Sequence, residues 1–257
     1  MANFPFQYFN DVSLSVVVPV YNEGAQIQEN LRLLLDEVKR YFQNVEVIVI
    51  SDGSTDTTNE QLKLIADENL KKIFLENNQG KGAALRKGFK EASGDFVLFI
   101  DGGMELHPRE IKIFLGLMFL YESDIVIGSK RHPQSTVYYP WYRRFLSFLF
   151  QKIVHSLFRI NVTDTQVGIK MFRRDVINAI MPYLESQSYG VDIEILGFAA
   201  RLGYRRILEA PVRLDYFLMN KRSFIQDGLH TLRVGSLLFK ETLWIWWRLR
   251  KIKQRSS

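Results

Sequence analysis

The chain has 257 residues, with 34 Lys and Arg against 28 Asp and Glu, so its net charge is +6 and its pI is about 9.4. No Pro-, Gly- or Ser-rich linker divides it, which favours one large domain with appendages. The lack of cysteine excludes a disulfide framework and a thiolate metal site.

The excess of basic residues favours an anionic partner. We expect no nucleic acid in that role, because the sequence has no helix-turn-helix, zinc-finger or RNP-like pattern. The N-terminus lacks a basic segment followed by an apolar one, so we expect no signal peptide and a protein that stays in the cytoplasm.

The first half alternates short apolar runs with segments of helical periodicity. Asp56 is a suitable N-cap for the second of the expected helices. Strands that alternate with helices indicate a mostly parallel sheet covered on both faces, so we predict an α/β, Rossmann-like fold. The expected strands are 14–20, 45–50, 72–75, 95–100 and 124–127, and the expected helices are 27–38, 56–69, 83–92 and 109–121.

An acidic turn follows the expected strand 95–100. In open α/β sheets ligands bind at the carboxyl ends of strands. Asp101 and Glu105 would place two carboxylates there, able to hold a hard divalent cation against a phosphate. The alternative is a solvated turn whose acids cap the helix that begins near Pro108.

A second turn, Gly80-Lys81-Gly82, invites comparison with phosphate-binding loops. Its spacing matches neither GxxxxGK[ST] nor GxGxxG, so we do not expect a P-loop nucleoside triphosphatase. Glycines at a strand-to-helix turn are a sufficient explanation for the fold.

The second half of the chain contains two segments rich in aromatic and basic residues. Residues 138–158 mix aromatic and apolar side chains with Arg143, Arg144 and Lys152, which is the composition of an interfacial amphipathic helix. The alternative is a core helix with a basic outer face. Residues 237–255 combine three tryptophans with the five basic side chains of residues 248–255, which suits a headgroup-level anchor on an anionic membrane. A solvated tail with one packed tryptophan is the alternative.

Three further elements are expected between these two segments. A polar turn at 164–168 leads into a short strand, a helix spans 191–202 with Gly203 at its end, and 205–216 holds one or two strands. We therefore divide the chain into an α/β domain of residues 1–216, which includes the amphipathic helix, and a helical, basic, tryptophan-rich tail of residues 217–257.

Taken in order, the turns resemble those of the inverting GT-A glycosyltransferases, and among them the polyprenyl-phosphate and dolichyl-phosphate hexose synthases. The resemblance covers most of residues 14–216 and implies a GT-A fold. The matching segments are Pro19–Glu23, Ser51–Asp56, Asn78–Gly82, Asp95 with Asp101, Gly128–Arg131, Asp164–Lys170 and Glu209–Val212.

The resemblance assigns roles to the residues at these turns. It implies that the nucleotide sugar is bound by Pro19, Tyr21, Glu23, Asp52 and Lys81, where carboxylates accept hydrogen bonds from the base or the ribose. It further implies that Asp101 and Glu105 hold Mg²⁺ or Mn²⁺ against the diphosphate, so that the leaving group departs with its charge neutralised.

Basic residues are implied to bind the donor and acceptor phosphates: Lys130, Arg131, and Arg143 or Arg144. The acceptor would be polyprenyl or dolichyl phosphate, which is already ionised, so in-line positioning matters more than a general base. Asp164 would orient the acceptor or an arginine. The catalytic residues implied are Asp101, Arg131 and Asp164.

Two positions depart from the family pattern. The family has Asp-x-Asp where this chain has Asp101-Gly102-Gly103, so the second metal carboxylate is absent. Ser51, where relatives often have Asp, is the smaller change. Two alternatives therefore stay open: a related glycosyltransferase with a glycan or soluble acceptor, and a catalytically impaired nucleotide-sugar-binding or membrane-scaffolding protein.

No apolar run reaches about 18 residues, so we expect no transmembrane span. We expect a peripheral protein at the cytoplasmic face of an anionic membrane. The segment Asp164–Phe172 resembles the glucosyl-type synthases more than the mannosyl ones, a slight preference for UDP-glucose over GDP-mannose.

Overall fold

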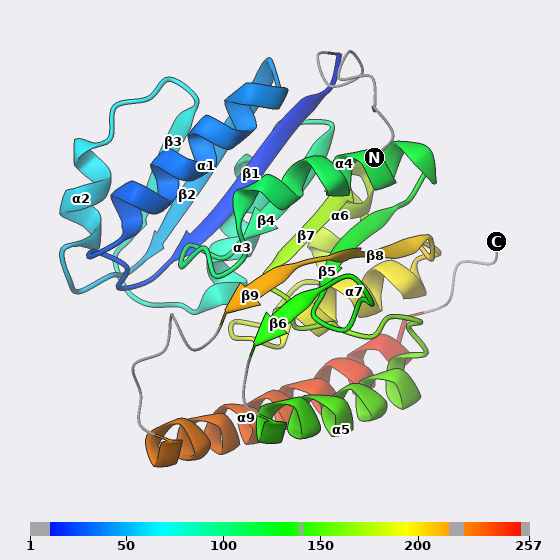
Figure 1. Ribbon diagram of the computed structural model, residues 1–257. Coiled ribbons are helices and arrows are strands. Elements are labelled where there is room, and N and C mark those ends of the chain that lie inside the picture. Colours follow the sequence, from blue (N-terminus) through cyan, green and yellow to red (C-terminus); the bar gives the residue numbers. More distant parts are fainter. Residues whose placement is uncertain (1–10, 139–140, 216–223, 253–257) are drawn as a thin grey trace.

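The computed structural model describes residues 11–138, 141–215 and 224–252. A seven-stranded sheet forms its centre (Figure 1). Strand β7 is antiparallel to both of its neighbours, and the other pairs are parallel. In spatial order the strands are β3 (Leu70–Leu75), β2 (Asn44–Asp52), β1 (Ser13–Val20), β4 (Phe96–Ile100), β7 (Ile169–Arg173), β5 (Ile125–Ser129) and β8 (Ile207–Pro211).

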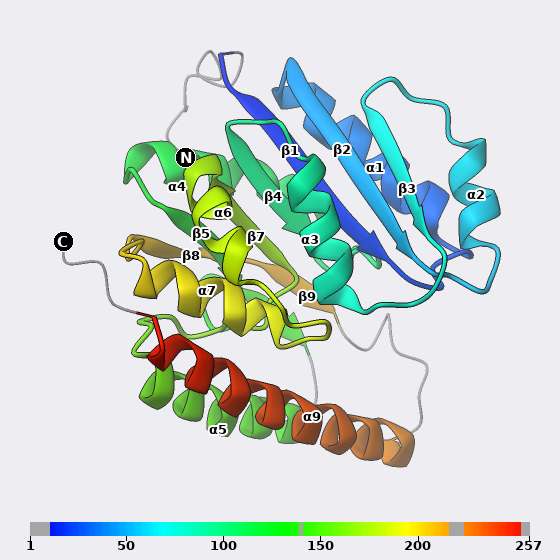
Figure 2. The same ribbon diagram turned by 180° about the vertical axis from the view of Figure 1, so that it is seen from behind.

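Helices cover both faces of this sheet. On one face lie α1 (Ile27–Tyr41) and α4 (Ile111–Leu120), with α2 (Thr58–Leu64) beside α1 (Figure 1). On the other face lie α3 (Lys81–Glu91), α6 (Arg174–Ile180) and α7 (Val191–Arg201), as Figure 2 shows. Two short 3₁₀ turns, Pro108–Glu110 and Met181–Tyr183, precede α4 and follow α6. The predicted α/β class with a mostly parallel, doubly covered sheet is confirmed.

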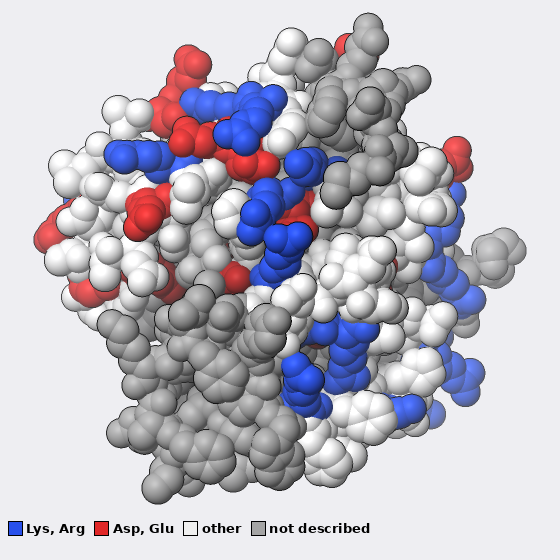
Figure 3. Space-filling model, viewed as in Figure 1, with Lys and Arg blue, Asp and Glu red and all other residues white. Residues whose placement is uncertain are grey.

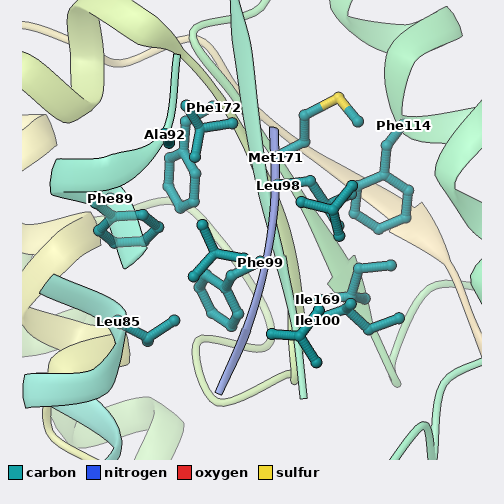
Figure 4. Packing of buried hydrophobic residues seen from close by; sticks show 14 of the residues in the cluster. Leu85, Phe89, Ala92, Leu98, Phe99, Ile100, Phe114, Ile169, Met171 and Phe172 are labelled. Carbon is teal, nitrogen blue, oxygen red and sulfur yellow. The ribbon is translucent and has the colours of Figure 1, made fainter. Parts of the chain in front are cut away.

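Alternate residues of the central strands fill the two layers of the core (Figure 4). On the α3 side, the ring of Phe99 lies 6.4 Å from that of Phe89 and 6.3 Å from that of Phe172, measured between centroids. On the α4 side, Leu98 is paired with Met171, and both are buried with Phe114. Because both faces of β4 are buried, its sequence is a continuous apolar run rather than an alternating one.

The antiparallel direction of β7 matters for the site. Ile169, the first residue of β7, pairs with Ile100, the last residue of β4. The loop that precedes β7 therefore reaches the edge of the sheet where the parallel strands end. The sequence predicted the polar turn and the strand, but not this direction.

A second, small sheet lies beside this edge. It consists of β6 (Thr136–Tyr138) and β9 (Arg213–Asp215), paired in parallel. Two long helices, α5 (Trp141–Phe158) and α9 (Phe224–Arg250), run side by side next to it (Figures 1 and 2). The helix expected over 138–158 is thus present.

Helix α9 packs on the α/β core through α7. Ile245 and Leu249 are buried in the main core cluster. The Arg248 guanidinium binds the buried carboxylate of Glu194 in α7 and donates to the carbonyl of Tyr183 at 2.6 Å. The predicted domain boundary between residues 216 and 217 lies outside the described residues and stays a prediction.

Helix α2 is shorter than the predicted range 56–69. It ends at Leu64, and the Lys72 ammonium binds the carbonyl oxygens of Leu62 and Ile65 at this end, at 3.2 and 2.7 Å. Asp56 accepts from the Thr58 backbone N–H at 2.9 Å, but Thr57 is the N-cap residue.

Helix α3 begins two residues before the predicted start at Ala83, so Lys81 lies in its first turn. Gly80 precedes the helix with φ of +89°, a conformation that favours glycine. A Cβ at Gly80 would also lie 2.2 Å from the Gln187 carbonyl oxygen. The glycines of this turn therefore let α3 approach the backbone of residues 186–187.

Candidate active site

The candidate site lies where β1, β2, β4 and β5 end and β7 begins. Asp101 follows β4 directly, and its backbone N–H donates to the Gly168 carbonyl at 2.9 Å. The turn that follows is tied to β1, because the Gly102 N–H donates to the Pro19 carbonyl at 3.2 Å. The loops after β1 and β4 and the loop before β7 are thus joined by backbone hydrogen bonds.

The Asp101 carboxylate is half-exposed and has two close neighbours. The Lys81 ammonium lies 2.8 Å from Asp101 Oδ1. Gly168 packs against the other oxygen, since a Cβ there would lie 2.2 Å from Asp101 Oδ2. Any side chain larger than hydrogen at Gly168 would displace this carboxylate.

A pocket of about 80 Å³ opens beside Asp101. Its lining includes Asp101, Glu105, Lys130 and Gln166. The Gln166 Nε2 atom is buried and has no hydrogen-bond partner among the described residues. A buried amide donor without a partner costs free energy, so this atom is available to donate to an oxygen of a ligand or a water.

Glu23 lies next to the position of the absent second aspartate. A Cβ at Gly103 would be 3.4 Å from Glu23 Oε1, which is ordinary van der Waals contact. Burial raises the pKa of Glu23, and the negative charges of Glu105, Asp56 and Asp101 raise it further. The acidic groups therefore repel one another, and a cation would relieve that repulsion.

The other residues predicted to bind the nucleotide lie on the same edge. Tyr21 is exposed after β1. Asp52 is buried at the end of β2, and its two oxygens accept from the backbone N–H groups of Gln79 and Gly80, both at 2.8 Å. This carboxylate therefore orders the turn that carries Lys81.

Asp164 is buried beside Lys130. Its Oδ2 accepts from the Lys130 backbone N–H at 3.1 Å and lies 3.7 Å from the Lys130 ammonium. Glu209 holds the loop in turn, accepting from the N–H groups of Thr163 and Asp164 at 2.9 and 3.2 Å. Asp164 Oδ1 also accepts from the Gln166 N–H at 3.2 Å. The sequence predicted that Asp164 orients the acceptor or an arginine; its charged partner among the described residues is Lys130, and its role toward the acceptor stays a prediction.

A larger cavity of about 690 Å³ adjoins Lys130 on the side of α5. Arg131 donates to Ser147 Oγ at 3.0 Å, and its guanidinium lies 5.7 Å from the centre of the Phe148 ring. The basic side chains that line the cavity are Lys130, Arg131, Arg144, Lys152 and His155. Figure 3 shows a group of Lys and Arg side chains on this face, close to α5.

The two predicted arginines of α5 differ in what the structure describes. Arg144 donates to the Val137 carbonyl at 2.7 Å and lines the basic cavity. The side chain of Arg143 lies outside the described residues. The roles predicted for all these residues stay predictions.

Three residues near the site had no predicted role: Gln166, Lys170 and Asp192. Lys170 is fully buried in β7, and its ammonium binds the carboxylate of Asp192 in the first turn of α7. A lysine in an apolar strand and an aspartate in an apolar helix were the available signals, but only the fold shows that they meet.

The donor atoms near Asp101 suit a hard divalent cation. Asp101 and Glu105 line the same pocket and offer carboxylate oxygens. The described part of the chain holds no group of three or more His, Cys, Asp or Glu side chains that could bind a metal by themselves. Mg²⁺ fits such a site, since it commonly takes one or two carboxylates together with substrate phosphates and waters.

Among the described residues, no helix is long and apolar enough to cross a membrane. Both α5 and α9 nevertheless expose large apolar side chains. On α5 these are Phe145, Leu146, Phe148, Leu149 and Ile153, and on α9 they are Leu237, Phe239, Leu243, Trp244 and Trp247.

Known proteins resemble the chain in sequence and in structure. It is 34% identical over 220 residues to a dolichyl-phosphate beta-glucosyltransferase of Trichomonas vaginalis, covering 78% of this chain and 65% of that protein. It is 31% identical over 196 residues to an undecaprenyl-phosphate 4-deoxy-4-formamido-L-arabinose transferase of Aeromonas hydrophila, covering 74% and 58%. The chain thus spans less than two thirds of either relative.

A solved structure with a similar fold is glucosyl-3-phosphoglycerate synthase of Mycobacterium tuberculosis, in complex with Mn²⁺, UDP and phosphoglyceric acid. The TM-score is 0.70 at 21% identity, over 96% of this chain and 84% of the other. The sequence of residues 15–181, more than half of the chain, matches the family described as glycosyl transferase family 2. The chain therefore belongs to glycosyl transferase family 2.

Proposed function

We propose that this protein transfers a hexose from a nucleotide sugar to polyprenyl or dolichyl phosphate, with inversion at the anomeric carbon. Its family membership and its relatives named for dolichyl-phosphate and undecaprenyl-phosphate transfer support this reaction class. The observation that carries the proposal is the position of Lys130, which lines both the acidic pocket at Asp101 and the basic cavity beside α5.

The basic cavity suits the acceptor phosphate. Arg131, Arg144 and Lys152 surround a space that also contains the ring of Phe148. The Lys152 ammonium and the Arg131 guanidinium lie 5.4 and 5.7 Å from the centre of that ring. Cations next to an apolar surface match a ligand that is a phosphate at one end and a hydrocarbon at the other.

The acidic pocket suits the donor diphosphate. Asp101 and Glu105 would hold Mg²⁺ or Mn²⁺, and the bound ion would neutralise the charge that develops on the departing nucleoside diphosphate. Lys130, which lines this pocket, and Lys81, which pairs with Asp101, both add positive charge there. Gln166 Nε2 would donate to an oxygen of the donor.

In the reaction, an acceptor phosphate oxygen forms a bond to the anomeric carbon while the bond from that carbon to the donor's diphosphate oxygen breaks. The acceptor oxygen is already ionised, so no proton has to be removed. Lys130 and Arg131 would orient that oxygen, and Asp164 would hold Lys130 in place. In-line positioning would then supply most of the rate.

The membrane is the expected location of such an acceptor. The apolar side chains exposed on α5 and α9 would enter the headgroup layer of an anionic membrane at its cytoplasmic face. Trp247 supports this, because its ring is exposed and the Lys251 ammonium lies 3.2 Å from its centre. Tryptophan beside a basic residue is typical of membrane–water interfaces.

The experiment that tests this proposal measures transfer of radiolabelled hexose to polyprenyl phosphate in detergent. UDP-glucose and GDP-mannose are supplied separately, each with Mg²⁺, Mn²⁺ or EDTA. We expect lipid-linked product from one donor, UDP-glucose in preference, and loss of that product in EDTA and in Asp101→Asn. The matched control is Glu122→Gln, a carboxylate exposed at the end of α4, which should leave transfer unchanged.

Two other results would contradict the proposal. Transfer to a soluble glycan but not to the lipid phosphate would favour a related glycosyltransferase with another acceptor. Nucleotide-sugar binding without transfer to any acceptor would favour an impaired homologue, for which the loss of a carboxylate at Gly103 is the available explanation.

A further inference from the structure

Four charges of alternating sign run in a line from the candidate site into the protein interior. The Lys81 ammonium lies between two carboxylates, 2.8 Å from Asp101 Oδ1 and 3.2 Å from Asp192 Oδ2. The other oxygen of Asp192 binds the Lys170 ammonium. Side-chain exposure falls along this line from 45% at Asp101 to 15% at Lys81, 2% at Asp192 and 0% at Lys170.

The inner end of this line is firmly held. The Lys170 ammonium also donates to the Val167 carbonyl at 2.7 Å. The Phe99 ring lies under both ammonium groups, with its centre 5.2 Å from that of Lys81 and 4.9 Å from that of Lys170. The start of α3 is fixed as well, since the Gly82 N–H donates to the Gln187 carbonyl at 2.9 Å. Lys81 is therefore directed at Asp101 by a rigid surround.

Asp192 and Lys170 neutralise each other, so the charge of Lys81 remains available to Asp101 and to any ligand next to it. The Lys81 ammonium forms ion pairs with the carboxylates of both Asp101 and Asp192, so it places a positive charge at the candidate metal site.

This cation has opposite effects on the two expected ligands. A divalent ion at Asp101 meets an ammonium that already occupies Oδ1 and repels it. A diphosphate next to the ion is attracted by the same ammonium. Gly103 offers no carboxylate to offset the repulsion.

We propose that Lys81, positioned by Asp192 and Lys170, makes binding of the divalent cation conditional on the donor's diphosphate. The inference rests on the proposed function only in taking a nucleoside diphosphate sugar as the donor. Because binding couplings are reciprocal, the ion must then strengthen nucleotide binding by the same factor as the nucleotide strengthens binding of the ion.

The test measures free Mn²⁺ by electron paramagnetic resonance, with and without UDP, and in a parallel series with GDP. In the unmodified protein we expect the Mn²⁺ dissociation constant to fall at least about tenfold when the correct nucleotide is present. In Lys81→Met we expect tighter binding of Mn²⁺ alone and a smaller effect of the nucleotide. Lys81→Arg keeps the charge and should retain most of the coupling.

Two further variants, at Asp192 and Lys170, test whether each charge changes Mn²⁺ binding with the expected sign. Asp192→Asn removes a negative charge near Lys81 and should weaken binding of Mn²⁺ alone, whereas Lys170→Met removes a positive one and should strengthen it. The matched control is Lys87→Met on the same helix, where the ammonium pairs with Glu91 at the surface. Circular dichroism shows which variants are folded. If Asp192→Asn and Lys170→Met do not fold, Lys81→Met and Lys81→Arg decide the question.

Equal or weaker binding of Mn²⁺ alone in Lys81→Met would overturn the inference, as would the absence of any nucleotide effect in the unmodified protein. Hexose transfer that persists under either result would leave the proposed function standing. Coupling that depends on Lys81, in a protein that transfers no hexose, would support the inference and contradict the function alone.

Discussion

The carboxylate of Asp164 binds Lys130 at both ends, accepting from its backbone N–H at 3.1 Å and lying 3.7 Å from its ammonium. Lys130 stands between the acidic pocket and the basic cavity, so Asp164 sets the position of a cation that faces both candidate substrates.

The first prediction concerns this contact. Asp164→Asn keeps an oxygen that can accept from the Lys130 N–H but loses the charge, so we expect kcat for hexose transfer to fall about tenfold without being abolished. In Asp164→Ala we expect kcat to fall further. The measurement is steady-state transfer at saturating donor with varied acceptor. A loss of 10³-fold or more in Asp164→Asn would instead indicate a general base and therefore an acceptor other than an ionised phosphate.

The second prediction concerns the missing aspartate. Gly103→Asp fits without a clash, because its Cβ would be 3.4 Å from Glu23 Oε1. The added carboxylate supplies a metal ligand but repels Glu23, so we expect tighter Mn²⁺ binding, a lower melting temperature in EDTA and recovery on addition of Mn²⁺. Calorimetry and thermal melting measure these effects. Gly103→Asn is the control, and equal Mn²⁺ affinity in the two variants would contradict the prediction.

The third prediction is a pH dependence. The pKa of Glu23 is raised above its ordinary value of 4.5, chiefly by burial. Protonation of Glu23 therefore begins at a higher pH than for an exposed glutamate, and the cluster becomes less attractive to a cation as pH falls through that range. We expect the affinity for Mn²⁺ with nucleotide to decline on acidification earlier in the unmodified protein than in Glu23→Gln.

Protonation of Glu23 has the opposite effect on the stability of the fold from its effect on Mn²⁺ binding. An acid whose pKa is raised by folding binds its proton more tightly in the folded state, so this group adds stability as pH falls through the raised pKa toward the ordinary value of 4.5. Urea unfolding at several pH values measures this contribution. A Glu23→Gln variant with an unchanged pH dependence of both binding and unfolding would rule out Glu23 as the group responsible.

The fourth prediction concerns the membrane. Replacing Phe145, Leu149 and Trp247 together with Ser should weaken binding to vesicles that contain phosphatidylglycerol by at least about tenfold, since burial of each such side chain contributes up to roughly 1.5–3 kcal/mol. Cosedimentation measures the change. The control replaces Leu64, Leu120 and Tyr121, which are at least as exposed but lie on the distant helix α2 and at the end of α4. Equal losses in the two triple variants would argue against a specific face.

The fifth prediction concerns the attachment of α9. Arg248→Met leaves the Glu194 carboxylate buried without its guanidinium partner, which should cost about 3 kcal/mol. For a protein of this size, that corresponds to a fall in melting temperature of roughly 6–12 °C. Arg250→Met is the control, because that side chain is exposed over Trp246. The penalty should shrink at low pH, where Glu194, whose pKa burial already raises, takes up a proton.

The periodicity of the sequence was sufficient to predict most elements of the sheet and the helices on its faces. Buried strands such as β4 are continuous apolar runs, and the helices show their apolar stripe, so both signals are local. Asp101 and Glu105 were identified because they lie in the turn that follows such a strand, whereas Lys130 was identified through the family resemblance. The extent of α2 was not predictable in this way, because the carbonyl groups at its end are bound by Lys72, which comes from the next strand.

The sequence by itself determined the fold class, the family and which polar turns lie at the strand ends, because these depend on residues close together in the chain. Only the tertiary structure decided what those turns contact. Asp192 lies 111 positions after Lys81, and the antiparallel β7 brings Lys170 to the other oxygen of the Asp192 carboxylate. Such a line of charges leaves no local pattern, since each residue acquires its partner only when separate elements pack together.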